Sequence, residues 1–184
     1  MALQLKSGKI VWEKPLETAP GTVAFYLAAG EDSLVINAST DKKFEVSAYA
    51  AVNGESLWSK TFGWFENKGD HGKAIQRPAI VGGRVYVRPK VLELKTGEIL
   101  PLEMPSGKCG TYAATTKSLV FRTSNITMWN KESGSASSWD RLRPGCWLST
   151  IPASGMLLSP EGGGGCSCGS WMEMSAGFMP VAEP

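Results

Sequence analysis

The chain has 184 residues, 42% of them hydrophobic, which is enough to bury the core of one domain or of one continuous array. Its net charge of +2 provides no electrostatic footprint for nucleic acid or for an anionic membrane surface. No apolar run approaches the ~20 residues of a membrane-spanning helix, and the opening residues, MALQLKSGK, lack the basic and apolar regions of a secretion signal.

In chain order, short strand-like runs alternate with polar turns, and one pattern recurs. Four segments align on a small polar residue followed by Gly. They are ALQLKSGKIVW (2–12), AYAAVNGESLW (48–58), VLELKTGEILP (91–101) and MWNKESGSASSW (128–139). The turn glycines are 46, 43 and 37 residues apart, at Gly8, Gly54, Gly97 and Gly134. We interpret each segment as a β-hairpin in which Gly supplies the positive φ of a tight connection.

The hairpins share other positions besides the Gly. Trp12 and Trp58 stand four residues after it, Pro101 takes that place in the third copy, and Trp139 lies one residue later in the fourth. The residue four before the Gly is polar in three of the four copies. This predicts a side-chain hydrogen bond onto the turn, which is lost where Ala50 stands.

Two further strand-like runs precede each of the last three hairpins. They are VAFYLAAG and SLVINAS, then RPAIVGG and RVYVRP, then TYAATT and SLVFRTS. Four strands per ~40 residues are typical of a β-propeller blade. A β-sandwich is the alternative, but it does not explain why Trp returns at the same offset. The predicted fold is therefore all-β, a β-propeller of four-stranded antiparallel blades.

The hairpin sequence resembles the tryptophan-docking motif, A-x-D-x-x-T-G-x-x-x-W, of the quinoprotein-type or pyrroloquinoline quinone (PQQ) repeat propellers. That superfamily includes the outer-membrane assembly lipoproteins and the quinoprotein alcohol dehydrogenases. The resemblance implies that the Trp of one blade packs against the turn of a neighbour. The family's Asp is absent from every copy. The motif carries over to Ala2, Gly8, Trp12, Ala48, Gly54, Trp58, Thr96 and Gly97, and more weakly to Gly134 and Trp139.

We expect one propeller array over residues 1–184, with about four to four and a half blades in a partial or open ring. This is fewer than propellers of the family usually have, so we expect the C-terminal part of a longer protein. The predicted segments are an outer hairpin (1–16), three blades (17–64, 70–105 and 106–143) and an irregular last blade rich in Cys and Gly (144–184).

All four cysteines, Cys109, Cys146, Cys166 and Cys168, fall in the later part of the chain. We interpret them as one or two structural disulfides of an exported protein, with three pairings open. The alternatives are a redox-active pair, reduced thiols, or a zinc site that includes His71. The Cys-x-Cys spacing lacks the two-residue spacer of usual zinc knuckles. His71 lies in a polar segment and is interpreted as a solvated loop residue. The glycines at 162–165 lack the Lys-Ser or Lys-Thr of a phosphate-binding loop.

Two classes of function follow from the resemblance. The first is a non-enzymatic scaffold that binds protein partners in the bacterial periplasm or cell envelope. The alternative is a fragment of a PQQ-dependent quinoprotein dehydrogenase, whose site would need PQQ, Ca²⁺ and a set of Asp, Asn and Glu on inner strands. No such set can be placed here, and Ser167 separates the cysteines that the enzymes hold adjacent. We therefore favour the scaffold and assign no catalytic, cofactor-binding or metal-binding residue.

Overall fold

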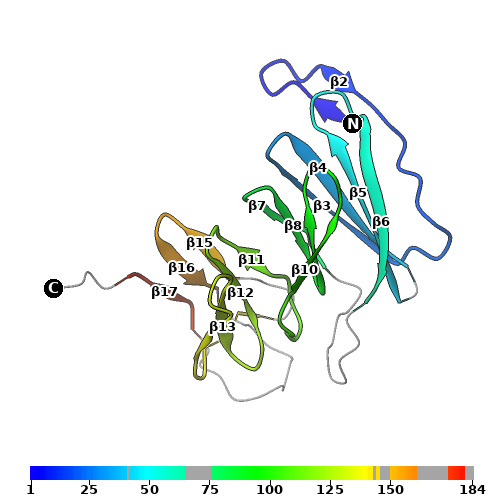
Figure 1. The fold of residues 1–184 in the computed structure, drawn as a ribbon. Helices are drawn as coiled ribbons and strands as arrows, with labels where there is room; N and C mark the ends of the chain where they lie inside the picture. Colours follow the sequence, from blue (N-terminus) through cyan, green and yellow to red (C-terminus); the bar gives the residue numbers. More distant parts are fainter. Residues whose placement is uncertain (41, 65–75, 143, 146–149, 161–173, 181–184) are drawn as a thin grey trace. The chain divides into compact units, whose positions relative to one another are not determined.

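The computed structural model describes residues 1–40, 42–64, 76–142, 144–145, 150–160 and 174–180. These residues form strands and turns and no helix, so none of them belongs to a helix that could cross a membrane (Figure 1). The chain divides into two compact units. Unit 1 contains Met1–Trp64 and Arg77–Met104, and unit 2 contains Phe65–Gln76 and Pro105–Pro184.

Unit 1 contains one two-stranded and two four-stranded antiparallel sheets. The two-stranded sheet pairs β1 (Ala2–Leu3) with β2 (Ile10–Trp12). The first four-stranded sheet contains β3 (Ala24–Gly30), β4 (Ser33–Ser39), β5 (Lys43–Ala50) and β6 (Ser56–Gly63). The second contains β7 (Ala79–Val81), β8 (Arg84–Val87), β9 (Lys90–Glu93) and β10 (Ile99–Glu103). In each sheet, neighbours in sequence are neighbours in space, as in a propeller blade.

Unit 2 contains a four-stranded and a three-stranded antiparallel sheet. The first contains β11 (Ala113–Ala114), β12 (Ser118–Arg122), β13 (Ile126–Asn130) and β14 (Ala136–Trp139). The second contains β15 (Ile151–Ala153), β16 (Met156–Ser159) and β17 (Ala176–Phe178). The strand-like runs identified in the sequence lie in these sheets and in those of unit 1, and the predicted all-β propeller fold is confirmed.

The core of unit 1 lies between its two four-stranded sheets. Strand β5 shows why it forms, because Phe44, Val46 and Ala48 alternate with polar residues and are fully buried on one face. They pack with Val35 and Trp58, and with Val85, Val87, Leu92 and Leu94 of the second sheet. This shared core fixes how the β3–β6 sheet faces the β7–β10 sheet.

The core of unit 2 is built from β12 and β13, where Leu119, Val120 and Ile126 are at most 2% exposed. The ring of Tyr112 stacks on Phe121 with centroids 4.6 Å apart, and its hydroxyl donates to the carbonyl of Pro105 at 2.6 Å. A buried tyrosine needs such a partner for its hydroxyl. Each unit therefore has an apolar interior of its own.

Candidate functional site

The four glycine turns predicted from the sequence have one backbone conformation. The φ angles of Gly8, Gly54, Gly97 and Gly134 lie between 68° and 72°. In each turn, the N–H of the residue four before the Gly donates to the carbonyl of the residue after it, at 2.8–2.9 Å. The Gly N–H donates back to that same residue four before it, at 2.8–3.0 Å. Because L-residues avoid this φ, the turn requires glycine.

Side chains reinforce these turns where the sequence predicts it. The carboxylate of Glu93 accepts a hydrogen bond from the N–H of Thr96 at 2.6 Å. The side-chain oxygen of Asn130 accepts from two N–H groups of its own turn at 2.9 Å. Ala50 has no such group, and there the side-chain oxygen of Asn53 accepts from the N–H of Glu55 at 3.1 Å instead. The turns are thus stabilised by local polar contacts.

Two of the predicted tryptophans lie on the glycine turns of a neighbouring sheet in unit 1. The indole N–H of Trp58 donates to the carbonyl of Leu94 at 2.7 Å, and its ring is so close that a Cβ on Gly97 would lie 2.5 Å from it. Trp12 repeats this arrangement. Its N–H donates to the carbonyl of Ala51 at 2.9 Å, and a Cβ on Gly54 would lie 2.7 Å from its ring.

The small residues of the motif lie beside these tryptophans. Ala48 is the cross-strand neighbour of Trp58, and Ala2 is that of Trp12. Thr96 serves its own turn, because its hydroxyl accepts a hydrogen bond from the N–H of Glu98 at 3.2 Å. The structure thus brings together most of the predicted motif residues of unit 1.

The fourth copy of the motif differs. Trp139 pairs across the strands with Ile126, whereas register equivalence with Trp58 would pair it with Met128. Trp139 is therefore two cross-strand pairs farther from the turn, and its ring packs on Phe178 with centroids 5.4 Å apart. A Cβ on Gly134 would have no neighbour within 4 Å among the described residues.

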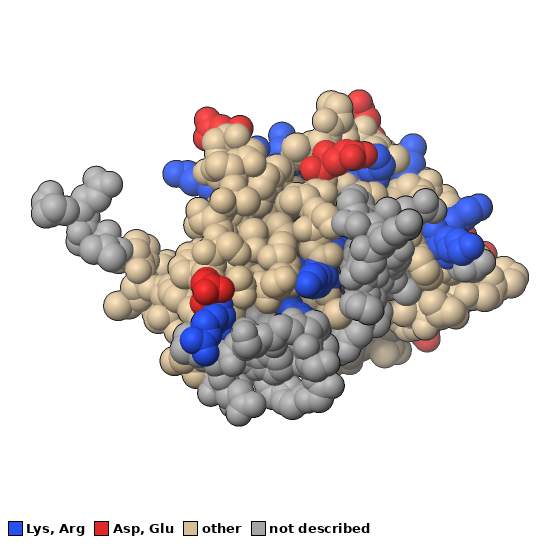
Figure 2. Space-filling model, turned by 90° about the horizontal axis from the view of Figure 1, so that it is seen from below, with Lys and Arg blue, Asp and Glu red and all other residues tan. Residues whose placement is uncertain are grey.

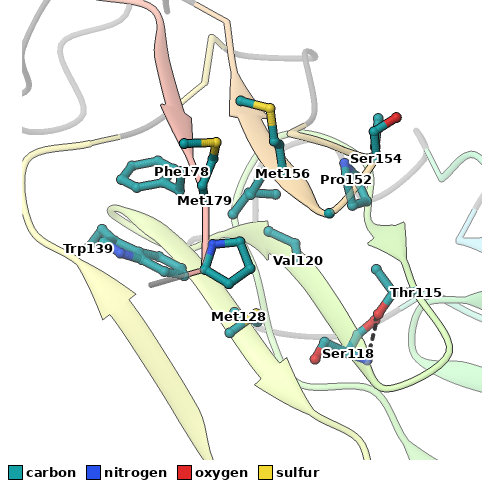
Figure 3. A pocket seen from close by; sticks show the side chains of 14 residues that line it. Thr115, Ser118, Val120, Met128, Trp139, Pro152, Ser154, Met156, Phe178 and Met179 are labelled. Atoms are coloured by element: carbon teal, nitrogen blue, oxygen red, sulfur yellow. Dashed lines mark hydrogen bonds between the residues drawn. The ribbon is translucent and has the colours of Figure 1, made fainter. Parts of the chain in front are cut away.

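Trp139 and Phe178 belong to an open groove in unit 2, between the β11–β14 and β15–β17 sheets (Figure 3). Its volume is about 540 Å³. The lining residues are Thr115, Ser118, Val120, Met128, Trp139, Pro152, Ala153, Ser154, Gly155, Met156, Leu157, Phe178, Met179 and Pro180. Figure 3 shows Trp139, Phe178 and Met179 on one side of the groove and Thr115 and Ser118 on another. Sequence reasoning missed this groove.

Among the described residues that line the groove there is no acidic, basic, His or Cys side chain. Its polar side chains are hydroxyls. That of Thr115 accepts a hydrogen bond from the N–H of Ser118 at 2.9 Å. A surface built mainly of apolar and aromatic side chains, as this lining is, can bind apolar groups.

The predicted disulfides are not confirmed. Cys109 is buried, 5% exposed, and its thiol is free. It occupies the interior as a small apolar side chain. Cys146, Cys166, Cys168, His71 and the glycines at 162–165 lie outside the described residues. Among the described residues, no three His, Cys, Asp or Glu side chains are grouped as metal ligands.

Two glutamates on the described surface have pKa values shifted by groups close to them. Slight burial raises the pKa of Glu93. This is outweighed by the hydrogen bond from the N–H of Thr96, by contacts with the Thr96 hydroxyl and Lys95, and by the Lys95 charge. The pKa of Glu93 is therefore lowered. The Lys90 ammonium, 2.8 Å away, lowers the pKa of Glu103. In the view of Figure 2, basic and acidic side chains are interspersed and form no continuous patch of one sign.

Comparison with known proteins gives a likeness of fold. No protein-family model and no curated protein matches the sequence. The computationally designed Ika4 protein is similar at 13% identity and a TM-score of 0.55, over 90% of this chain and 95% of that chain. BamB from Moraxella catarrhalis has 14% sequence identity and a TM-score of 0.47, over 85% of this chain and 50% of that chain. The computationally designed Ika8 protein has 14% sequence identity and a TM-score of 0.48, over 73% of this chain and 41% of that chain. The likeness to Ika4 concerns the fold alone.

Sequence reasoning also missed a buried polar position that recurs in the propeller blades. Asn37, Arg88 and Arg122 are 1%, 1% and 3% exposed, and all three make interactions within the chain. In each blade, the residue four before the turn Gly pairs with a residue of the preceding strand. The buried polar residue lies four positions after that paired residue. The signal was present, because one polar residue interrupts the apolar run in SLVINAS, RVYVRP and SLVFRTS.

Proposed function

We propose that the protein is a non-enzymatic β-propeller of the PQQ-like repeat type that acts as a protein-interaction scaffold in the bacterial cell envelope. The observation that carries the scaffold assignment is the groove of unit 2. Its surface is open and apolar, and the described residues that line it include no acidic, basic, His or Cys side chain. A propeller blade is a rigid element on which such a surface can be presented.

The lining of the groove favours a protein segment with large apolar side chains as its ligand. Met128, Met156 and Met179 have flexible thioether side chains, which adapt to differently shaped partners. Trp139 and Phe178 provide aromatic surface, and aromatic residues and Met are enriched at protein interfaces. The hydroxyls of Thr115, Ser118 and Ser154 offer hydrogen bonds to the backbone of the segment.

Support for the PQQ-like repeat assignment comes from the contacts of the two tryptophans in unit 1. Trp12 lies on Gly54 and Trp58 lies on Gly97, each with its indole N–H bonded to a turn carbonyl. This is the packing that the motif resemblance implies. The proposed envelope location rests on that resemblance. It is tested by fractionating cells that express the tagged protein and locating the tag, and a cytosolic tag would contradict it.

The groove is tested by selecting binders from a random peptide library on the immobilised protein. We expect the enriched peptides to contain clustered aromatic or large aliphatic residues. Fluorescence anisotropy should show that Met128→Glu weakens their binding by about tenfold or more, because it places a charge on the apolar surface. Met174→Glu is the matched control, since Met174 is 44% exposed and does not line the groove. Equal effects of both changes would contradict the proposal.

The enzymatic alternative is tested separately by titrating the folded protein with PQQ and Ca²⁺. Quinone absorbance and Trp fluorescence are followed together. We expect no saturable binding. A saturable quenching curve that depends on Ca²⁺ would overturn the non-enzymatic assignment and favour the dehydrogenase.

A further inference from the structure

The β3–β6 sheet of unit 1 is apolar on one face and, over β3 and β4, apolar on the other face as well. One face carries Phe44 and Val46 into the core. Cross-strand pairing places Phe25, Leu27 and Ile36 on the opposite face. Phe25 and Leu27 are 53% and 49% exposed. An antiparallel sheet with one solvated face normally carries polar residues there, so a second apolar face indicates that something binds to it.

Part of this second face is already covered within unit 1. The β1–β2 hairpin and the residues after it place Trp12, Pro15 and Leu16 around a cavity of about 140 Å³ that Leu27 and Tyr49 also line. The Lys14 ammonium lies over the ring of Tyr49, 4.9 Å from its centroid. The exposed part of the face is therefore continuous with an interface that the chain makes with itself.

The complete sheets show what kind of element pairs with the edge of a glycine-turn hairpin. In each of them, the hairpin of the first two strands lies next to the hairpin that contains the glycine turn. A carbonyl at the tip of the first hairpin accepts the N–H of the residue three before the turn Gly. The pairs are Asp32 with Ala51 at 2.9 Å, Gly83 with Leu94 at 2.8 Å, and Lys117 with Lys131 at 2.9 Å.

The β1–β2 hairpin has the same turn, but no first hairpin pairs with it among the described strands. The equivalent N–H is that of Leu5, which has no acceptor among the described residues and whose residue is fully exposed. Within the described part of the chain, no strand other than β2 pairs with β1. An open strand edge, an open N–H and an apolar face thus lie together in one unit.

We infer that unit 1 binds a two-stranded antiparallel β-hairpin of a partner protein at this place. One strand of the partner pairs with the β1 edge, a carbonyl at its tip accepts the N–H of Leu5, and its apolar side chains cover Phe25 and Leu27. Addition of strands to an open edge is an established mode of protein recognition. This surface is in unit 1, whereas the proposed groove is in unit 2, so the inference goes beyond the proposed function.

The probe is the peptide of residues 78–87 (PAIVGGRVYV), cyclised through its ends, which reproduces the chain's own β7–β8 hairpin. Binding to the full chain is measured by anisotropy of the labelled peptide, and the contact region by hydrogen exchange. We expect saturable binding, with added protection over residues 2–8 and 24–38. A cyclic peptide of the same composition in scrambled order should not bind.

The variants identify the face. Leu27→Lys should weaken binding by about tenfold or more, because it places a charge where apolar burial is expected. Ile99→Lys should have no effect, since Ile99 is 40% exposed on β10 and does not line the cavity of this face. Met128→Glu in the groove should also have no effect, so failure of one proposal is distinguished from failure of the other.

Three results would overturn the inference. The first is no peptide binding by a chain that circular dichroism shows to be folded. The second is binding that Leu27→Lys leaves unchanged. The third is concentration-dependent self-association in sedimentation experiments that Leu27→Lys abolishes, because a second copy of the chain would then occupy the face in place of a partner.

Discussion

At the scale of the residue, Gly97 is the most constrained of the four turn glycines. Gly97→Ala places an L-residue at a φ of 69° and a Cβ 2.5 Å from the ring of the buried Trp58. The backbone term costs about 1–2 kcal/mol, and overpacking costs about 1–3 kcal/mol more. We expect a loss of roughly 2–5 kcal/mol in the free energy of unfolding, measured by denaturant titration.

Gly134→Ala is the matched control for this change. Gly134 has the same φ of 69° in the same type of turn, but its Cβ would have no neighbour within 4 Å among the described residues. The control should therefore show the backbone term alone, about 1–2 kcal/mol. Equal losses of unfolding free energy in the two variants would mean that the ring of Trp58 can move away from the new Cβ without destabilising the fold.

Glu93 makes the stabilisation of its turn depend on pH. Its pKa in the folded chain is lower than its ordinary value of 4.5, so its carboxylate adds stability above that pH. This contribution is lost as the pH falls through the folded pKa. The stability difference between the wild type and Glu93→Gln, from denaturant titrations, should be larger at about pH 6.5 than at about pH 3.5. An equal stability difference at the two pH values would contradict this prediction.

Sequence analysis was most successful where a single physical requirement selects a single residue type. Glycine is required by positive φ, so the turns at Gly8, Gly54, Gly97 and Gly134 were identified correctly. It was weaker for Trp139, because an offset of one residue in sequence becomes a change of cross-strand pair, which only the register reveals. The sequence left the state of Cys109 open, since burial cannot be read from cysteine spacing.

At the scale of the element, the two tryptophans that contact glycine turns have different consequences. Trp58 is buried in the core of unit 1, whereas Trp12 connects the short β1–β2 hairpin to the β3–β6 sheet. Trp58→Ala should lower the free energy of unfolding by about 3–5 kcal/mol. Trp12→Ala should release the hairpin and leave the core intact.

Hydrogen exchange distinguishes these outcomes. In Trp12→Ala, protection should be lost over residues 2–12 and kept in β4, β5 and β8. In Trp58→Ala, protection should fall across the β3–β6 and β7–β10 sheets together. If Trp12→Ala also exposed β4 and β5, the β1–β2 hairpin would be part of the cooperative core of unit 1.

The elements themselves could be predicted because alternation and turn residues are local signals. The strand at 33–39 lies in SLVINAS, a short apolar run that the sequence analysis identified as strand-like. The groove could not be predicted, because Met128 and Met156 are far apart in sequence and meet only when two sheets lie side by side.

At the scale of the whole molecule, the chain has two compact units, each with its own interior. Leu92 is fully buried in the core shared by the two four-stranded sheets of unit 1. Leu92→Ala should cost about 2–5 kcal/mol. Because the stability of repeats is largely local, we expect protection against hydrogen exchange to fall throughout β3–β10 and much less in β12 and β13. A uniform loss would show that the units unfold as one.

The division into two units is a property that sequence periodicity does not contain. The repeats predict one array, since each glycine turn follows the last at a similar spacing. Tertiary contacts decide where an array separates, and these depend on which sheet faces bury the most apolar surface. The core between β3–β6 and β7–β10 is an example, because nine residues from both sheets are buried together there.

The four turns share their main-chain hydrogen bonds, while their side chains have little in common beyond the glycine and the small polar residue before it. A hairpin specified in this way can be copied by gene duplication and then diverge at nearly every other position without losing its shape. Likeness of sequence therefore decays much sooner than likeness of fold. A chain of this kind can have 13% identity to a designed protein and still share its architecture at a TM-score of 0.55.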